Sequence, residues 1–243
     1  MERATYDRLR DQEQHHWWFV GRRAILAAEI ARLGLPAQPK ILEVGCGTGG
    51  NLSLLSQFGE VSAVEPDAPS RAHAATRSQV DARAGALPDG LPDFGHRFDL
   101  VCAFDVVEHV EDDVGAIAAL AEQLAPCGQL MITVPAYDWL WSSHDVAHHH
   151  KRRYVRRQLQ QRLAKAGLKV RRLTYFNTLL LPPIAAVRLG RRVLGRDGGD
   201  DEALPAPALN SLLTGVLKAE ARLLARAPLP FGVSLLAVAE SAR

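Results

Sequence analysis

The sequence predicts an α/β protein in which a mostly parallel sheet is covered by helices on both faces. Short apolar, β-rich runs alternate along the chain with segments of helical periodicity, which is typical of parallel sheets buried between helices. A glycine-rich turn lies between the first such run and the helical pattern after it. The chain has 243 residues and 47% hydrophobic content, enough to bury one sizeable core.

Each expected element rests on its own local pattern. The first four strands are expected at Lys40–Val44, Val61–Glu65, Phe98–Phe104 and Gln129–Val134, with a weaker strand near Ala82–Ala84. The helices between them are expected at Gly50–Gln57, Asp67–Arg77 and Asp112–Leu124. Farther along, a basic helix at Val155–Ala166 precedes alternating strands at Lys169–Tyr175 and Val233–Ala239.

The chain divides into four predicted parts. Residues 1–38 form an N-terminal helical cap, in which the helical segments Arg3–Gln14 and Phe19–Leu33 flank the aromatic residues Trp17 and Trp18. Residues 39–176 form the core, and residues 230–243 supply its final strand. Residues 177–229 are a helical insertion with apolar patches around Leu179–Leu194 and Leu209–Leu224, separated by the linker Gly195–Glu202.

Composition excludes several classes of protein. The net charge of +2 gives no global field for nucleic acid, so no DNA partner is expected. Cys46, Cys102 and Cys127 have no metal-binding or redox spacing, which indicates reduced thiols in a cytoplasmic protein. The N-terminus lacks the apolar core of a signal peptide, and the longest apolar stretch is too short to cross a bilayer. The oligomeric state stays open.

The glycine turn at residues 45–50 fits two classes of ligand. Gly45, Gly47 and Gly50 have dinucleotide-binding spacing, whereas Gly45, Gly47 and Gly49 have the spacing typical of methyltransferases. Glu43, two residues before the first glycine, could receive an ammonium group but would repel a pyrophosphate. Glu65 ends the next strand about twenty residues on, where a carboxylate can accept both ribose hydroxyls.

Four motifs in order resemble the class I S-adenosylmethionine-dependent methyltransferases. They are Ile41-Leu-Glu-Val-Gly-Cys-Gly-Thr-Gly49, Val64-Glu-Pro-Asp67, Phe98-Asp-Leu-Val-Cys-Ala-Phe-Asp-Val-Val-Glu-His109 and Leu124-Ala-Pro-Cys-Gly-Gln-Leu130. The resemblance covers about residues 17 to 176. It implies a Rossmann-like, seven-stranded sheet whose last strand is antiparallel, with S-adenosylmethionine as cofactor.

The resemblance also implies the cofactor-binding residues. Glu43, Gly45, Cys46, Gly47 and Gly49 would surround the methionine part. Glu65 and Pro66 would hold the ribose, and Phe104 and Asp105 would form the floor. At the third strand the chain reads Gly85-Ala86-Leu87 where many relatives have Gly-Asp, so the backbone around Ala86 and Leu87 would contact the adenine.

Within this family, the ubiquinone-biosynthesis O-methyltransferases are similar in further features. These are the Trp17-Trp18 pair, the Glu108-His109 pair, and a His144-Asp145 element before the basic segment Lys151-Arg-Arg153. In that group an N-terminal arginine binds the cofactor carboxylate, and Arg22 or Arg23 can match it; we assign Arg23. The similarity implies a hydroxylated acceptor.

Methyl transfer needs alignment, and a base where the acceptor must lose a proton. The candidate catalytic residues are His109, as the base, with Glu108 and His144. A small-molecule acceptor methylated at oxygen is expected. A basic cluster, residues 151–172, and the apolar helix after Leu179 favour a phosphorylated or lipidic acceptor, or peripheral membrane association. A solvated helix face, core packing and dimerisation explain these segments equally well.

Three alternative functions stay open. Asp105, Glu108 and His109, with His144, His148, His149 or His150, resemble the metal-binding pattern of small-RNA 2′-O-methyltransferases. We assign no metal to these residues from the sequence, since exposed histidine runs often bind nothing specific. The second alternative is a nucleotide-dependent oxidoreductase that uses the same glycines, and the third is an inactive, cofactor-binding partner subunit.

Overall fold

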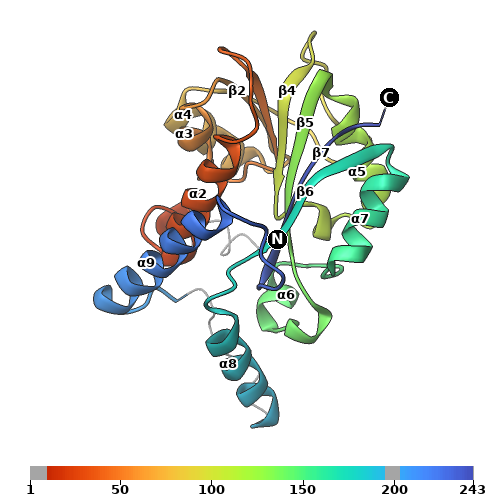
Figure 1. The fold of residues 1–243 in the computed structure, drawn as a ribbon. Helices are drawn as coiled ribbons and strands as arrows, with labels where there is room; N and C mark the ends of the chain where they lie inside the picture. The colour runs from red at the N-terminus through yellow and green to blue at the C-terminus, as the bar shows by residue number, and fades with distance from the viewer. Residues whose placement is uncertain (1–9, 195–202, 243) are drawn as a thin grey trace.

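The computed structural model describes residues 10–194 and 203–242. Its centre is a seven-stranded sheet with the order β3-β2-β1-β4-β5-β7-β6. Strand β7 runs antiparallel to its neighbours β5 and β6, and the other pairs are parallel. This confirms the predicted fold class, including the antiparallel last strand (Figure 1).

The strands have the following bounds: β1 Lys40–Val44, β2 Glu60–Val64, β3 Asp81–Arg83, β4 Phe98–Phe104, β5 Leu124–Pro135, β6 Leu168–Phe176 and β7 Ser234–Ser241. Most agree with the sequence prediction to within one or two residues. Strand β5 begins five residues before the predicted Gln129, because Leu124 pairs with Phe98 across a register shift in β4. The helix before it therefore ends at Glu122.

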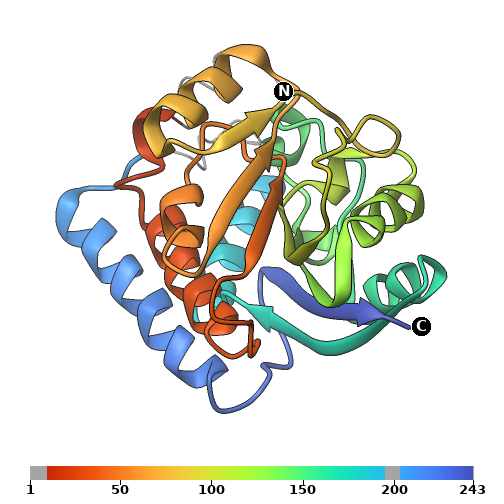
Figure 2. The same cartoon turned by 90° about the horizontal axis from the view of Figure 1, so that it is seen from above.

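Helices cover both faces of the sheet, and each face has its own apolar core. On one face lie α5 (Asp113–Glu122) and α7 (Arg156–Lys165), which bury Ile117, Leu120, Leu159 and Leu163. The other face carries α2 (Trp17–Ile30), α3 (Leu52–Leu55), α4 (Ala68–Ser78) and α9 (Pro207–Leu224). Figure 2 shows the two layers on either side of the strands.

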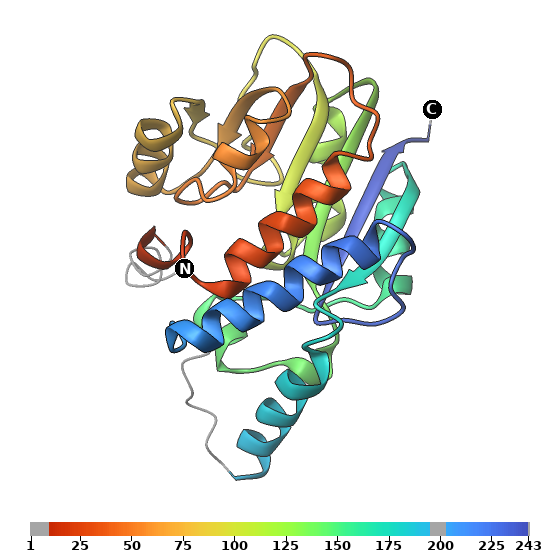
Figure 3. The ribbon, with the colours of Figure 1, turned by 60° about the vertical axis from the view of Figure 1, so that its left-hand side comes forward.

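The N-terminal cap and the insertion pack together. Helix α9 lies beside α2 across one face of the sheet (Figure 3). A Cβ atom on Gly21 would lie 2.5 Å from the Leu217 side chain, so only glycine permits this approach. Asn210 accepts a hydrogen bond from the Trp17 backbone amide at 2.8 Å. Core packing therefore explains the apolar residues Leu217, Ala221 and Leu224 of α9.

Helix α8 (Leu181–Val193) differs from α9, because it buries none of its residues and projects away from the sheet (Figure 3). The predicted linker 195–202 between the two helices lies outside the described residues, as does most of the predicted first helix; residues 10–12 are helical. The division into four parts stays a prediction. None of the helices in the described part of the chain has the length and apolar character to span a bilayer.

Candidate cofactor and acceptor site

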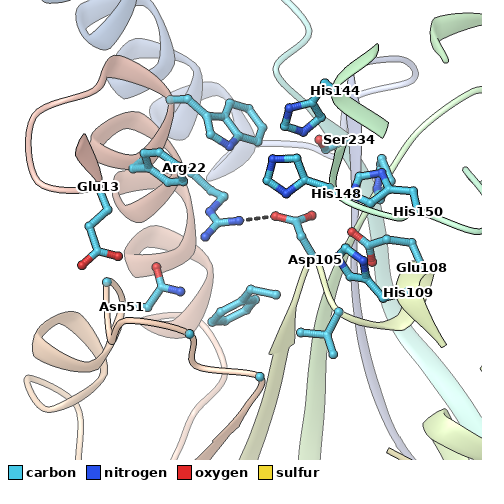
Figure 4. Close-up of a pocket in the computed structure, with 18 of the residues that line it drawn as sticks. Glu13, Arg22, Asn51, Asp105, Glu108, His109, His144, His148, His150 and Ser234 are labelled. Carbon is cyan, nitrogen blue, oxygen red and sulfur yellow. Dashed lines mark hydrogen bonds and ion pairs between the residues drawn. The ribbon is translucent and has the colours of Figure 1, made fainter. Parts of the chain in front are cut away.

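A cavity of about 890 Å³ opens at the carboxyl-terminal edge of the parallel strands. Open α/β sheets bind ligands at this edge, since every parallel strand delivers its following loop there. Glu65 and Asp105 come directly after β2 and β4. Because β7 is antiparallel, it begins at this edge, and Ser234 lies in register with Pro135 and Phe176. Residues distant in sequence therefore line one space (Figure 4).

The glycine loop forms one end of the cavity. Gly45, Gly47 and Gly49 have φ angles of 77°, 54° and 85°. Residues other than glycine rarely adopt this backbone conformation. A Cβ atom on Gly45 would lie 2.5 Å from Val106, whereas a Cβ on Gly47 would meet nothing within 4 Å. Gly45 is therefore required for packing, and Gly47 faces open space in which a ligand can approach the backbone.

Two acidic residues accompany the loop. Glu65 lines the cavity and accepts hydrogen bonds from the Gly47 and Asp67 amides at 2.8 and 2.9 Å. Burial raises its pKa, although these two bonds oppose the rise. Glu43 lies behind the loop at 1% exposure and accepts a bond from Asn51 at 2.8 Å. Burial raises the pKa of Glu43 to about 7.

Helix α2 supplies the two arginines named in the sequence prediction. Arg22 forms an ion pair with Asp105 (Figure 4), and Asp105 also accepts a hydrogen bond from Thr133 at 3.1 Å. Arg23 donates to the Gly50 carbonyl at 3.4 Å, and burial and the neighbouring Arg22 lower its pKa. Both arginines line the cavity.

Glu13 lies over the glycine loop, and the sequence analysis did not single it out. Its carboxylate accepts from the Thr48 hydroxyl at 2.8 Å and pairs with Arg77. A Cβ atom on Gly50 would lie 2.4 Å from a Glu13 carboxylate oxygen. Gly50 therefore lies directly against the N-terminal segment, and a side chain at this position would require the Glu13 carboxylate to shift.

Histidines and one carboxylate gather at the other end of the cavity (Figure 4). Glu108 and His109 belong to the short helix η1 (Val107–His109) after β4. His144 belongs to α6 (Ser143–Ala147), and His148 and His150 follow that helix. The ring centres of His109 and His150 lie 4.7 Å apart, and those of His144 and His148 lie 4.2 Å apart.

The environment shifts the pKa values of Glu108 and His109 in opposite directions. Glu108 is fully buried, and burial with the nearby Asp105 raises its pKa well above the usual range. Burial, and the neighbouring His150 and His148, lower the pKa of His109 to about 4. A hydrogen bond to the His148 backbone opposes this drop.

Asp145 fixes the histidine segment. It is fully buried and accepts two bonds from Arg153 and one from His150 Nδ1, each at 2.8 Å. Although burial acts in the opposite direction, these bonds hold the pKa of Asp145 well below its usual range. Asp145 also closes a capping box with Ser142 at the start of α6. This capping explains why a short helix begins at Ser143.

Five arginines of the predicted basic cluster form ion pairs with carboxylates of the same chain. Arg153 is 4% exposed, Arg172 pairs with Glu29, and Arg171 pairs with Glu240. Arg152 and Arg162 both reach Asp113. These five guanidinium groups have carboxylate partners, so they give little support to an anionic ligand.

The predicted site residues mostly meet in this one cavity. It is lined by Arg23, Gly45, Cys46, Gly47, Glu65, Pro66, Ala86, Leu87, Phe104, Asp105, Glu108, His109 and His144. Glu43 and Gly49 lie outside its lining. Trp17, Trp18 and Phe19 also line it, with Leu180, Ile184 and Val187 from the insertion.

The comparison with protein families decides between the ligand classes that the glycine loop allows. Residues 17–173 match the family model described as a methyltransferase domain. The chain belongs to this family. The match confirms the predicted class I S-adenosylmethionine-dependent methyltransferase family and favours it over a dinucleotide-dependent oxidoreductase.

Curated relatives match over a part of their length. The biotin biosynthesis bifunctional protein BioCD of Bordetella avium is 33% identical over 141 residues, which is 55% of this chain and 30% of that protein. The ubiquinone biosynthesis O-methyltransferase of Xanthomonas campestris is 33% identical over 109 residues, 42% of this chain and 45% of that protein. The chain thus spans less than half the length of these relatives.

Solved structures share the fold. One neighbour belongs to a complex between the Trm112 methyltransferase activator of Haloferax volcanii and a methyltransferase. It aligns with a TM-score of 0.65 at 18% identity, over 99% of this chain and 95% of that neighbour. The glycopeptide N-methyltransferase MtfA in complex with S-adenosylmethionine has a TM-score of 0.56 at 15% identity, over 90% and 93%. Together with the family match, these findings support S-adenosylmethionine as the cofactor.

Proposed function

We propose that this chain transfers a methyl group from S-adenosylmethionine to an oxygen atom of a small-molecule acceptor. One observation carries the proposal: a single cavity joins the glycine loop to the group formed by Glu108, His109 and His144. The cofactor-binding end and the proton-accepting end thus face the same space, as direct transfer between two bound molecules requires.

The residues at the loop end fit this cofactor. Gly47 leaves open space beside its backbone, Glu65 would accept the ribose hydroxyls, and the backbone of Ala86 and Leu87 would contact the adenine. Arg23, with Cys46 and Gly45, would surround the methionine part. Buried Arg22 Nε has no hydrogen-bond partner in the described chain, so a ligand carboxylate could satisfy it. When bound, the cofactor supplies an electrophilic methyl group on a sulfonium.

The residues at the other end would prepare the acceptor. A hydroxyl must lose its proton as its oxygen forms the bond to the methyl carbon, while the electron pair of the breaking carbon–sulfur bond stays on sulfur. His109 and His144 both face the cavity, and a neutral imidazole at either position can take the proton. Glu108 lies beside them and would help to position the acceptor.

The wall between the two ends favours an acceptor with an apolar part. Trp17, Trp18, Ile184 and Val187 line it, and the last two belong to α8. This helix also leaves Leu189 and Val193 exposed, at 45% and 86%. Because five arginines of the basic cluster are paired internally, a lipidic acceptor has more support than a phosphorylated one, and α8 would rest on the membrane surface that supplies it.

Ligand binding tests the cofactor assignment first. Calorimetry should show micromolar binding of S-adenosylhomocysteine and no binding of NAD; tight NAD binding alone would reject the proposal. Hydroxylated acceptors differing in the length of an apolar chain should then gain one methyl group by mass spectrometry, with faster turnover for longer chains. Methylation at nitrogen, with no product at oxygen, would reject the acceptor assignment.

Flotation with liposomes tests the role of α8. The wild-type chain should float with liposomes, and Val193→Glu with Leu189→Glu should float less while binding S-adenosylhomocysteine equally well. A chain that never floats would exclude the membrane role. It would make a protein contact the better assignment for α8, since the Haloferax volcanii structure contains a Trm112 activator.

A further inference from the structure

We propose that Glu108, His109 and His150 form a binding site for a transition-metal ion such as Zn²⁺. One ligand atom from each of the three residues lies within 4.8 Å of the others. Glu108 and His109 come from the turn after β4, and His150 follows α6, so the site joins two loops at the sheet edge (Figure 4).

The state of Glu108 is the independent observation that points to a cation. Its side chain is fully buried, and neither carboxylate oxygen has a hydrogen-bond partner in another residue of the described chain. A buried acid without partners is costly. Its backbone carbonyl accepts from the Lys151 amide at 2.8 Å, which ties Glu108 to the segment that carries His150. A bound cation would satisfy the carboxylate that the fold leaves unpaired.

Both histidines are oriented as metal ligands usually are. A ligating histidine commonly gives its second ring nitrogen to a carboxylate or a carbonyl, which fixes the ring and its tautomer. His150 uses Nδ1 for Asp145 at 2.8 Å, and Arg153 holds Asp145 in turn. His109 forms a hydrogen bond with the His148 backbone. Each ring therefore keeps one nitrogen for an ion.

The ligand set selects the class of ion. Two imidazoles and one carboxylate suit Zn²⁺ and similar first-row ions, whereas Mg²⁺ and Ca²⁺ prefer oxygen ligands. Asp105 does not complete the set, since Arg22 and Thr133 already engage it. Three protein ligands leave a position open toward the cavity, which is typical of catalytic sites.

A second triad shares His150. His144, His148 and His150 also bring ligand atoms within 4.8 Å of one another. We assign the ion to the first triad, because only that triad contains the unpartnered carboxylate. His144 then stays available as the base of the reaction. This last step rests on the proposed function, in which the ion would lower the pKa of the acceptor hydroxyl; the metal site itself does not.

Metal titration of the full chain tests the site without methyl transfer. Co²⁺ should give a ligand-field absorption band that saturates at one ion per chain, and Zn²⁺ should displace it. Glu108→Gln and His150→Ala should each weaken Zn²⁺ binding by at least about 10-fold. His149→Asn is the matched control: His149 is exposed, lies outside both triads and has a φ of 56°, which asparagine tolerates. It should bind Zn²⁺ like the wild type.

Two results would overturn the proposal. One is a wild-type chain that shows no saturable Co²⁺ band. The other is Zn²⁺ binding that survives in Glu108→Gln but disappears in His148→Ala, which would place the ion in the second triad. S-adenosylhomocysteine affinity, measured for every variant, reports folding and tests the proposed function separately, because it requires no metal.

Discussion

Glu43 offers a test of how the glycine loop is built. In the folded chain burial raises its pKa from 4.5 to about 7. At about 1.4 kcal/mol per pH unit, this corresponds to about 3 kcal/mol. Below about pH 4.5 both folded and unfolded chains hold the proton, so nothing is lost. Between the two pKa values the unfolded chain releases a proton that the folded chain keeps, so rising pH destabilises the fold.

Glu43→Gln removes this titration and keeps the acceptor oxygen for Asn51. The unfolding free energy of the variant minus that of the wild type should therefore rise by about 3 kcal/mol between about pH 4.5 and about pH 8. Urea unfolding at several pH values measures it, and all other titrating groups cancel in the difference. A difference that is independent of pH would refute the reasoning. If Glu43 also receives the cofactor ammonium, saturating S-adenosylhomocysteine should reduce the rise.

Three further predictions concern the cofactor end and the histidine segment. Gly47→Val should abolish S-adenosylhomocysteine binding in calorimetry, whereas Gly95→Val, also at positive φ with open space around its Cβ, should retain it. Glu65→Gln should weaken that binding by about 1–3 kcal/mol, the usual cost of a lost charge-assisted bond; an unchanged dissociation constant would exclude a ribose contact. Asp145→Asn should destabilise the chain by about 3–5 kcal/mol in urea unfolding, because Arg153 becomes a buried, unpaired charge, and a loss below about 1 kcal/mol would contradict this account.

The sheet and the glycine loop were predictable because their signals are local. A five-residue apolar strand followed by closely spaced glycines indicates both the strand and the turn, and β1 has the predicted bounds Lys40–Val44. The position of Glu65 follows in the same way, since it ends the next strand. The burial of Glu43 follows from its position in an otherwise apolar strand. Its partner Asn51 was not predictable, since that contact depends on where the start of α3 packs.

Contacts between distant segments were harder to predict. Glu13 accepts a hydrogen bond from Thr48 and forms an ion pair with Arg77. It lies, however, in a polar segment whose sequence is typical of a solvent-exposed helix. Arg153 looks like part of a basic face, and only the fold brings it to Asp145 in the buried interior. A run of basic residues in the sequence shows only how many charges a segment carries. The partner of each charge depends on which loops meet at the sheet edge.

The histidine segment shows why composition and geometry lead to different conclusions. In sequence, His144, His148, His149 and His150 form one run next to an acid, and Asp105, Glu108 and His109 form a separate group. The fold separates these residues by function: Arg22 engages Asp105, Asp145 orients His150, and His149 stays exposed. Glu108 is then the acid whose carboxylate is both buried and unpartnered among the residues facing the histidines. A cation site at this edge therefore depends on the carboxylate that the fold leaves unpaired, and counting histidines could not have identified it.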